Sequence, residues 1–225
     1  MLPTEIPVMT LPNATLFPQA LLPLYIFEPR YRQMLRDVLQ TNRMFSVAMQ
    51  KPGCLREVPA PVAGLGVVRV SVGHDDGTSH LVLQGLIRVE LLETIRYKPY
   101  RLQRIRVLET PPVDTVTVDA LVAKVRELLA ERLTTGLPLP FPTMAGKEDD
   151  VESPCQCSEN VGQAVLEHVG ALRNPEHVAD LVSCAVLRCA RRRQAILEAT
   201  DIPTRLRRLI LFLTEEIAEH RTEKP

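Results

Sequence analysis

The chain has 225 residues, of which 45% are hydrophobic and 24% charged, and its formal net charge at pH 7 is zero. This is the composition of an ordinary globular protein, and it provides no whole-molecule field that favours nucleic acid or anionic lipid. The first residues, MLPTEIP, lack the basic start of a signal peptide, and the longest apolar run, Ala20 to Phe27, is far below the ~20 residues of a membrane span. We therefore expect a cytoplasmic protein with no membrane partner.

Residues 16–39 change from a proline-punctuated apolar strand to a helix. Pro18 and Pro23 lack a backbone N–H, so this strand is predicted to be an edge strand or a bulged one. Pro29 suits the first turn of a helix, where the missing N–H costs nothing. Beyond it, spacings of three and four residues predict one buried stripe, formed by Tyr31, Met34, Leu35 and Val38.

The next part of the chain, up to residue 107, alternates like β-strands. Half-buried strands are predicted with their inner faces at Phe45, Val47, Met49, Val68, Val70, Val72, Leu81, Leu83, Ile87, Val89 and Leu91. The run 73–78 is a turn in which Gly77 can take a positive φ, and Gly85 marks a bulge or bend. These strands form a bent hairpin of the kind found in a small, partly closed barrel. Arg101 to Val107 is predicted as a last strand at an edge.

The pair Pro111-Pro112 ends the β half, which gives two predicted subdomains, 1–110 and 113–225. A helix is predicted over 118–133, with Thr117 as its N-cap and an apolar face of Leu121, Val122, Val125, Leu128, Leu129 and Leu133. Gly136 and three prolines end it, at Pro138, Pro140 and Pro142. Residues 143–159, with the acidic triplet 148–150, are predicted to be a solvated surface loop rather than a binding loop.

Helices are predicted for the last quarter of the chain. Asn174-Pro175-Glu176 combines a cap, a first-turn proline and an acid suited to the helix dipole. Its apolar face is Val178, Leu181, Val182, Ala185 and Val186, and a second segment holds Ala195, Ile196 and Leu197. Asp201 and Pro203 open a terminal helix whose buried stripe is Leu206, Leu209, Ile210, Leu213 and Ile217. The pattern between 187 and 193 leaves open whether the chain bends there.

Metal binding and catalysis find little support in the side chains present. Candidate zinc ligands are Cys155, Cys157, His168, His177, Cys184 and Cys189, but the cysteine spacings lack the two-residue gap of zinc knuckles, so no metal is predicted. An odd count of five cysteines suits reduced thiols. His74 with Asp75-Asp76 is explained more simply as a turn than as an acid–base group. Cys184 and His177 are two helical turns apart, too far for a direct thiol–imidazole bond.

Two further features have both a binding interpretation and a structural one. Seven arginines make the C-terminal helices basic, at Arg188, Arg191, Arg192, Arg193, Arg205, Arg207 and Arg208. RNA binding is the alternative, but without Trp and with 4% aromatic residues, solvated helix faces with glutamate partners are favoured. The run 27–31 is interpreted as a corner that locks strand to helix, with Glu28 and Arg30 in local polar contacts, in preference to a contact surface for clients.

Several motifs resemble those of the N-terminal domain of Lon proteases. The segment "LFP…LPL.IFEPRY" of that family is matched at 16–18, 22–24 and 26–31, although Gln19 stands where the family often has glycine. Further matches are Gly66, Asp76-Gly77-Thr78, Gly85, Arg88, Pro99-Tyr100, Asn174-Pro175, Ala179-Asp180-Leu181, Gln194, Ile196-Leu197-Glu198, Asp201 and Arg205-Leu206. The likeness runs from about Pro7 to Ile217. It implies an α+β fold with a PUA-like bent β-sheet or pseudo-barrel followed by a helical bundle.

The resemblance also implies a function, because this domain contributes to substrate recognition in full-length Lon. We expect a non-catalytic polypeptide-binding module that holds unfolded or extended segments, linked to quality control or to a protease acting in trans. The only Gly-Lys pair, Gly146-Lys147, is no P-loop, since Phe141 and Glu148 stand at required positions. With eight residues after Ile217, neither the AAA+ module nor the Ser-Lys peptidase is expected. No catalytic, cofactor or metal residue is predicted, and the polypeptide-binding residues are unknown. An enzyme acting on a small ligand in the barrel is a further alternative.

Overall fold

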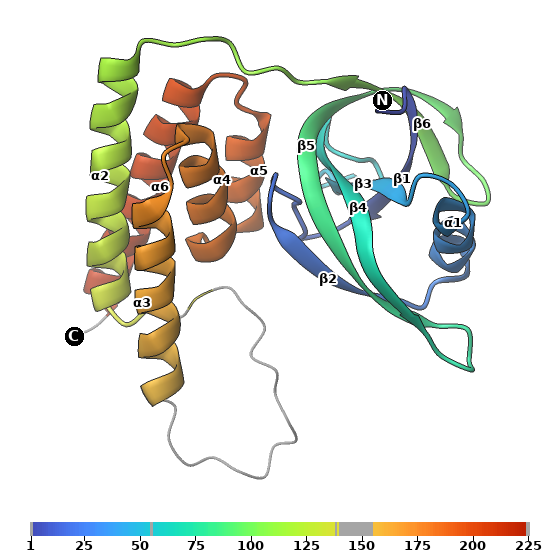
Figure 1. Cartoon of the computed structure of the whole chain (residues 1–225), viewed down its shortest axis with the longest axis horizontal. Helices are drawn as coiled ribbons and strands as arrows, with labels where there is room; N and C mark the ends of the chain where they lie inside the picture. Colours follow the sequence, from blue (N-terminus) through green and yellow to red (C-terminus); the bar gives the residue numbers. More distant parts are fainter. Residues whose placement is uncertain (1, 55, 138, 140–154, 224–225) are drawn as a thin grey trace. The chain divides into compact units, whose positions relative to one another are not determined.

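The computed structural model describes residues 2–54, 56–137, 139 and 155–223, which form two compact units within 1–110 and 111–225 (Figure 1). The first unit contains β1 (Glu5–Leu11), β2 (Leu21–Ile26), α1 (Pro29–Leu39), β3 (Met44–Met49), β4 (Val62–Gly73), β5 (Ser79–Arg96) and β6 (Arg101–Val107). The second contains α2 (Thr115–Thr134), α3 (Cys155–Ala171), α4 (Pro175–Val186), α5 (Ala190–Glu198) and α6 (Ile202–Glu223). The predicted α+β class, with a bent sheet before a helical bundle, is confirmed.

The strands of the first unit form one sheet in the order β2-β5-β4-β3-β1-β6, with a further pairing between β5 and β6. The long strand β5 pairs with β2 over its first half and with β6 over its second half. This change of partner closes β1, β3, β4, β5 and β6 into a small barrel and leaves β2 attached to one side (Figure 1). The predicted edge strand at 101–107 is therefore wrong, because β6 pairs with β1 on one side and β5 on the other.

The central strand β3 separates two apolar cores, and it is buried on both faces. Phe45 and Val47 point into the core beneath α1, and Ala48 points into the barrel interior. Ser46 is also fully buried, and its hydroxyl donates to the backbone oxygen of Gly64 at 2.8 Å. The prediction of a half-buried strand was therefore wrong here, because the helix covers the second face.

The proline-marked strand and the helix after it are confirmed. Within the described residues β2 pairs only with β5, as expected of an edge strand, and α1 begins at Pro29. The four residues predicted to be buried in α1 are all buried, at Tyr31, Met34, Leu35 and Val38. Gln19, before β2, has a φ of 66°, a left-handed conformation that explains why glycine is favoured at such a position.

Gly85 marks the predicted bulge in β5. Gly66 pairs with Gly85 whereas Leu65 pairs with Ile87, so one extra residue of β5 lies between these pairs. A Cβ on Gly85 would lie 2.0 Å from the backbone oxygen of Phe17. The missing side chain thus lets the segment before β2 cross directly over the sheet.

Beyond a second register shift between Val68 and Val70, the outer half of β4 leaves the core. Val68 is buried, whereas Val70 and Val72 are each 54% exposed. The prediction that both valines lie on the inner face was therefore wrong, because the register shift removes these positions from the inner face.

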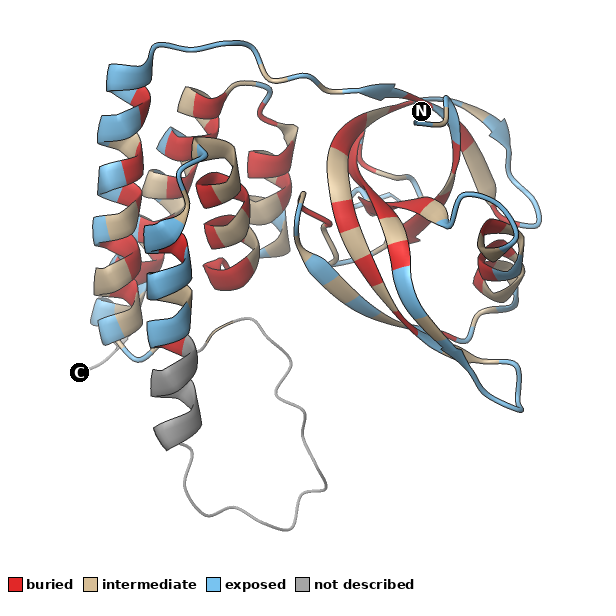
Figure 2. Ribbon diagram, viewed as in Figure 1, coloured by how far each residue is buried: buried red, intermediate tan, exposed pale blue. Residues whose placement is uncertain are grey.

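In the second unit the helices bury apolar stripes against one another, and Figure 2 shows the buried side of α2 facing the other helices of this unit. α2 begins at Thr115 with Asp114 as its N-cap, whose carboxylate accepts from the backbone N–H groups of Val116 and Thr117. The prediction that Thr117 is the N-cap was therefore wrong. Its backbone N–H instead donates to the cap residue, Asp114. Leu121 and Leu133 are only partly buried, and Arg132 takes a buried position.

The helix α3 corrects the predicted loop over 143–159, since residues 155–159 belong to it. The rest of that loop, its acidic triplet, Pro138, Pro140 and Pro142 lie outside the described residues. The caps at Asn174 and Asp201 are confirmed, with their side-chain oxygens accepting from the N–H groups of Glu176 and Thr204. Residues 187–189 are not helical and separate α4 from α5, so the helical pattern does not run straight through this region.

Buried ion pairs join the helices of the second unit. Arg205 is fully buried and donates to Asp180 at 3.4 Å and to Glu176 at 3.3 Å. Arg132, also fully buried, lies 3.5 Å from the Glu216 carboxylate. These contacts tie α4 and α2 to α6.

Candidate functional site

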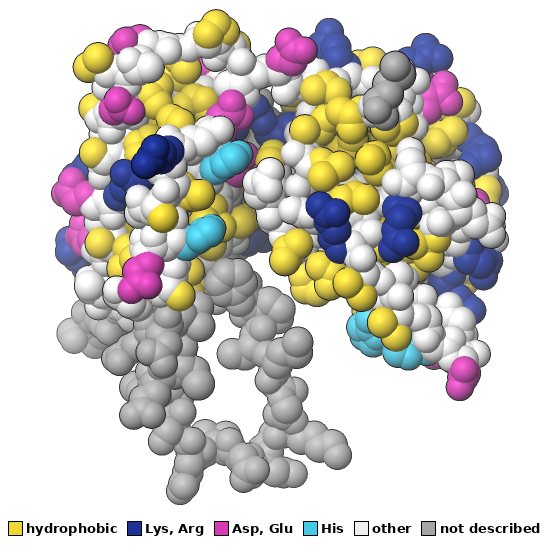
Figure 3. Space-filling model, viewed as in Figure 1, with side chains coloured by type: hydrophobic (Ala, Val, Ile, Leu, Met, Phe, Trp, Pro, Cys, Tyr) yellow, Lys and Arg dark blue, Asp and Glu magenta, His cyan; other side chains and the backbone are white. Residues whose placement is uncertain are grey.

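An exposed apolar surface covers one side of the strands β2, β5 and β4, and we call it the β2–β5–β4 face. Cross-strand pairing places Tyr25, His80 and Val72 in one row and Pro23, Val82 and Val70 in the next, and the face also includes Leu21 and Phe27. Leu21 is 63% exposed, Phe27 59% and Tyr25 49%. Figure 3 shows hydrophobic side chains gathered over these strands, with histidines near the end of the hairpin. Contiguous exposed apolar area of this kind marks sites of contact with other molecules.

The free edge of β2 borders this face. Among the residues that the structure describes, β2 has a strand partner on one side only, through the antiparallel register from Leu21–Gln84 to Ile26–Ser79. An unpaired edge presents backbone N–H and C=O groups that an extended chain can bind as an added strand. Pro23 interrupts this edge by removing one N–H.

Aromatic rings and imidazoles stack at the end of the face nearest the hairpin. The Tyr25 ring lies 5.8 Å from that of Phe27 and 4.7 Å from that of His80, between ring centroids. The Nε2 atom of His74 lies 2.7 Å from Nδ1 of His80. Stacked rings give a rigid apolar platform at low entropic cost.

The corner at 27–31 holds β2 against α1, as predicted. Glu28 and Arg30 form an ion pair at 2.8 Å, and Arg30 also binds Glu57 at 2.6 Å. The Tyr31 hydroxyl accepts from the backbone N–H of Thr10 and donates to the backbone oxygen of the same residue, each at 3.2 Å. Burial, together with the Glu57 charge, raises the pKa of Tyr31 to about 12. Phe27 is the exception in this run, because its exposed ring belongs to the β2–β5–β4 face.

Residues 73–78 form the turn between β4 and β5, as predicted. The Asp76 carboxylate accepts from the backbone N–H and hydroxyl of Thr78, and Gly77 has a φ of 78°. These contacts confirm the turn interpretation, and they lower the pKa of Asp76 through the hydrogen bonds from Thr78. His74 contacts His80 rather than either aspartate.

The seven C-terminal arginines do not form one basic surface. Arg205 is buried, Arg192 contacts Glu215, Glu216 and Glu219, and Arg193 and Arg208 donate to backbone oxygens. The prediction that these arginines lie on solvated helix faces was therefore wrong for Arg205, which is buried in the helical core. The RNA-binding alternative stays a prediction that rests on the exposed Arg188, Arg191 and Arg207.

The candidate metal ligands are not assembled into a site in the described part of the chain. No group of three or more His, Cys, Asp or Glu side chains there has the geometry to hold an ion, and the side chains of Cys155 and Cys157 lie outside it. Burial raises the pKa of the Cys184 thiol to about 12. None of the helices described is long and apolar enough to cross a bilayer.

Sequence reasoning missed the residues that make the β2–β5–β4 face. Val70 and Val72 were predicted to lie on inner faces, and His80 was not considered. The edge strand was predicted, but the exposure of its Leu21 and Tyr25 side chains was not. One signal was present, because prolines flank and interrupt this strand, as they do at the free edges of sheets.

Comparison with known proteins identifies the family. Residues 5–215 match the "ATP-dependent protease La (LON) substrate-binding domain". The Lon protease of Dictyoglomus thermophilum is 23% identical over 219 residues, and that of Anaeromyxobacter dehalogenans is 24% identical over 222 residues. Each alignment covers 96% of this chain but 25% and 24% of the relative, so the chain spans about a quarter of the length of these proteins.

Solved structures share the fold. The N-terminal domain of the Mycobacterium avium complex Lon protease superposes with a TM-score of 0.66 at 18% identity, covering 94% of this chain and 98% of that one. The Lon N-terminal domain protein from Xanthomonas campestris gives a TM-score of 0.52 at 18% identity, covering 93% and 98%.

Proposed function

The chain belongs to the family of Lon substrate-binding domains, and from this premise we propose that it binds unfolded or extended polypeptide segments without cleaving them. The observation that carries the proposal is the β2–β5–β4 face, where exposed Leu21, Tyr25 and Phe27 lie beside an unpaired strand edge. Apolar side chains of a client would pack on this face while its backbone adds a strand to β2. Delivery to a protease and a role in quality control belong to the same proposal.

Binding of this kind is expected to be weak and general. The apolar side chains of the face offer hydrophobic contact, but ordering a flexible client consumes much of the contact energy. Because the contacts are apolar and backbone-mediated, affinity should change little as salt screens charges. Sequence preference should be limited to segments that combine apolar residues with the ability to extend.

Leu21→Ser is the sharpest test of the face. Leu21 is 63% exposed, so a client that covers it gains most of the roughly 1.5–3 kcal/mol of a buried leucine. We expect the Kd for reduced, alkylated α-lactalbumin to rise by about 5- to 30-fold, which corresponds to about 1–2 kcal/mol. The matched control is Leu211→Ser on α6, where the leucine is 52% exposed in the other unit and no effect is expected.

The measurement is fluorescence anisotropy of the labelled client at several salt concentrations. Equal Kd values for Leu21→Ser, Leu211→Ser and the unmodified protein would contradict the role of this face. Loss of binding at moderate ionic strength would contradict apolar recognition and favour a charged ligand. Co-purification from native cells tests whether a protease is the partner.

A further inference from the structure

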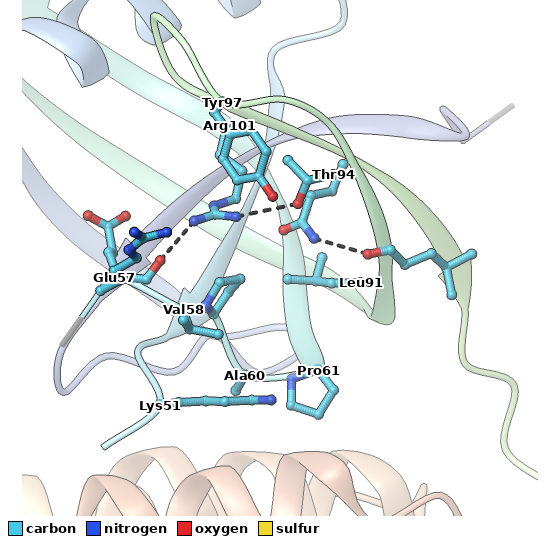
Figure 4. Close-up of a pocket in the computed structure, with 13 residues that line it drawn as sticks. Lys51, Glu57, Val58, Ala60, Pro61, Leu91, Thr94, Tyr97 and Arg101 are labelled. Atoms are coloured by element: carbon cyan, nitrogen blue, oxygen red, sulfur yellow. Dashed lines mark hydrogen bonds between the residues drawn. The ribbon is translucent and has the colours of Figure 1, made fainter. Parts of the chain in front are cut away.

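A second feature of the first unit, a hollow of about 470 Å³, lies away from the residues of the β2–β5–β4 face (Figure 4). It is lined by Lys51, by residues 56–61 and by residues of β5 and β6, including Leu91, Thr94 and Arg101. Its volume is within the range of pockets that hold small ligands, and Val58, Leu92 and Tyr97 contribute exposed hydrophobic side chains to its lining.

The hollow has an excess of positive charge. Lys51, Arg56 and Arg101 line it, whereas Glu57 is the single carboxylate among the described residues of its lining. The Glu57 carboxylate is already engaged, by Arg30 at 2.6 Å and by the Tyr31 hydroxyl at 3.4 Å. Among the described residues no carboxylate lies within ion-pair distance of the three cations. An anion entering here would therefore meet cations that form no ion pair with an acid of the described residues.

Arg101 is held in place before any ligand arrives. One Nη donates to the backbone oxygen of Glu57 at 2.8 Å and the other to the Thr94 hydroxyl at 3.4 Å, while the guanidinium lies 5.1 Å from the centre of the Tyr97 ring. Figure 4 shows it across the hollow from Lys51, with Val58 and Leu91 between them. A guanidinium fixed in this way loses little entropy on binding a carboxylate.

The remaining wall is apolar. Ala60 and Leu91 are buried at 3% and 8% exposure, and Val58 and Pro61 complete this side. The C-terminal residue of a polypeptide matches both halves of the hollow, because it carries a carboxylate and a side chain on one Cα. An acidic side chain in mid-chain would instead place polar backbone groups against this apolar wall.

We propose that this hollow binds the C-terminal residue of a polypeptide, with the terminal carboxylate on Arg101, the last side chain against Val58 and Leu91, and the Lys51 ammonium on the far side adding to the positive potential. The inference rests on the proposed function in that its ligand is a polypeptide, but it uses other residues. The protein then has one surface for extended segments and a separate site for chain ends.

The test compares peptides that differ only at the end. A fluorescein-labelled pentapeptide ending in Ala-Leu is titrated with the full chain as the free acid and as the amide, and Kd is read from anisotropy. We expect the acid to bind about tenfold more tightly or better, the range of a hydrogen-bonded charge. A third peptide with an amidated end and an aspartate before it tests a side-chain carboxylate. The inference would be overturned by equal affinity of the acid and the amide, or by absence of binding. It would also be overturned if the third peptide bound as tightly as the free acid.

Variants place the effect in the hollow. Arg101→Gln should raise the Kd of the acid about tenfold, and Lys51→Gln, which removes a more distant charge, should raise it by about twofold to fivefold. Both should leave the Kd of the amide unchanged. Lys51 is exposed and its side chain has no partner within the described structure, so Lys51→Gln keeps the protein folded even if Arg101→Gln does not. Lys124→Gln on the surface of α2 is the matched control and should change neither value.

The two proposals fail separately. Leu21→Ser should weaken α-lactalbumin binding and leave the ratio of acid to amide intact, and Lys51→Gln should alter that ratio only. An acid preference that survives Lys51→Gln and Arg101→Gln would show that the carboxylate binds elsewhere. That result would leave the β2–β5–β4 face untouched.

Discussion

Gly85→Ala tests how the sheet, its bulge and the edge strand depend on one another. A Cβ at this position would lie 2.0 Å from the backbone oxygen of Phe17, whereas ordinary van der Waals contact begins near 3.4 Å. One backbone must therefore move by more than 1 Å. That movement would disturb the hydrogen bonds from the Gln19 N–H to Gly85 and from the Gly85 N–H to Ala20, at 2.9 and 2.8 Å, which anchor the start of β2.

The expected loss in free energy of unfolding is about 2–3 kcal/mol, the upper part of the range for overpacking, because the obstacle is backbone rather than a flexible side chain. Urea denaturation followed by circular dichroism measures it. Gly73→Ala is the matched control, since a Cβ there meets only the Ser79 hydroxyl at 3.9 Å. Client binding should also weaken in Gly85→Ala, because β2 carries the face. A loss no larger than that of Gly73→Ala would refute the close-approach reasoning.

Other predictions concern the second unit. Asp201→Ala should lose about 1 kcal/mol of stability while Asp201→Asn loses little, because both Asp and Asn accept from the Thr204 N–H. That N–H lowers the pKa of Asp201. The charge-dependent part of its stabilisation is therefore present above the unfolded pKa of about 4 and disappears as pH falls through the folded pKa. If urea titrations gave free energies of unfolding for the protein and for Asp201→Asn that change in parallel below pH 4, this would be contradicted. Arg205→Met should cost about 3–5 kcal/mol by leaving Asp180 buried without this cation, and thermal unfolding unchanged from the parent would be evidence against it. At pH 8, iodoacetamide should modify the exposed Cys54 and Cys189 but not Cys184, whose buried thiol has its pKa raised to about 12; mass spectrometry of the folded protein that finds Cys184 labelled first would disprove this.

Local sequence determined most of the elements and their ends. Pro29 and the stripe of Tyr31, Met34, Leu35 and Val38 identified α1, and Asn174 and Asp201 identified two helix starts. These predictions succeeded because caps, proline positions and helical spacing act within a few residues, so the chain carries the whole signal. The motifs around 16–31 also indicate the family, which the match over residues 5–215 confirms.

Strand faces and edges were decided only by the tertiary structure. β3 is buried on both sides because α1 covers it, Val70 and Val72 are exposed because of a register shift, and β6 is no edge because bent β5 closes the barrel. Each outcome depends on a partner distant in the chain, and a period of two cannot say which face a distant helix will cover. The cations of the hollow likewise come together from positions 51, 56 and 101 only when the barrel closes. For β2, the prolines in the sequence limited the strand to an edge or a bulge because proline lacks an N–H, and the pairing with β5 decided that it is an edge.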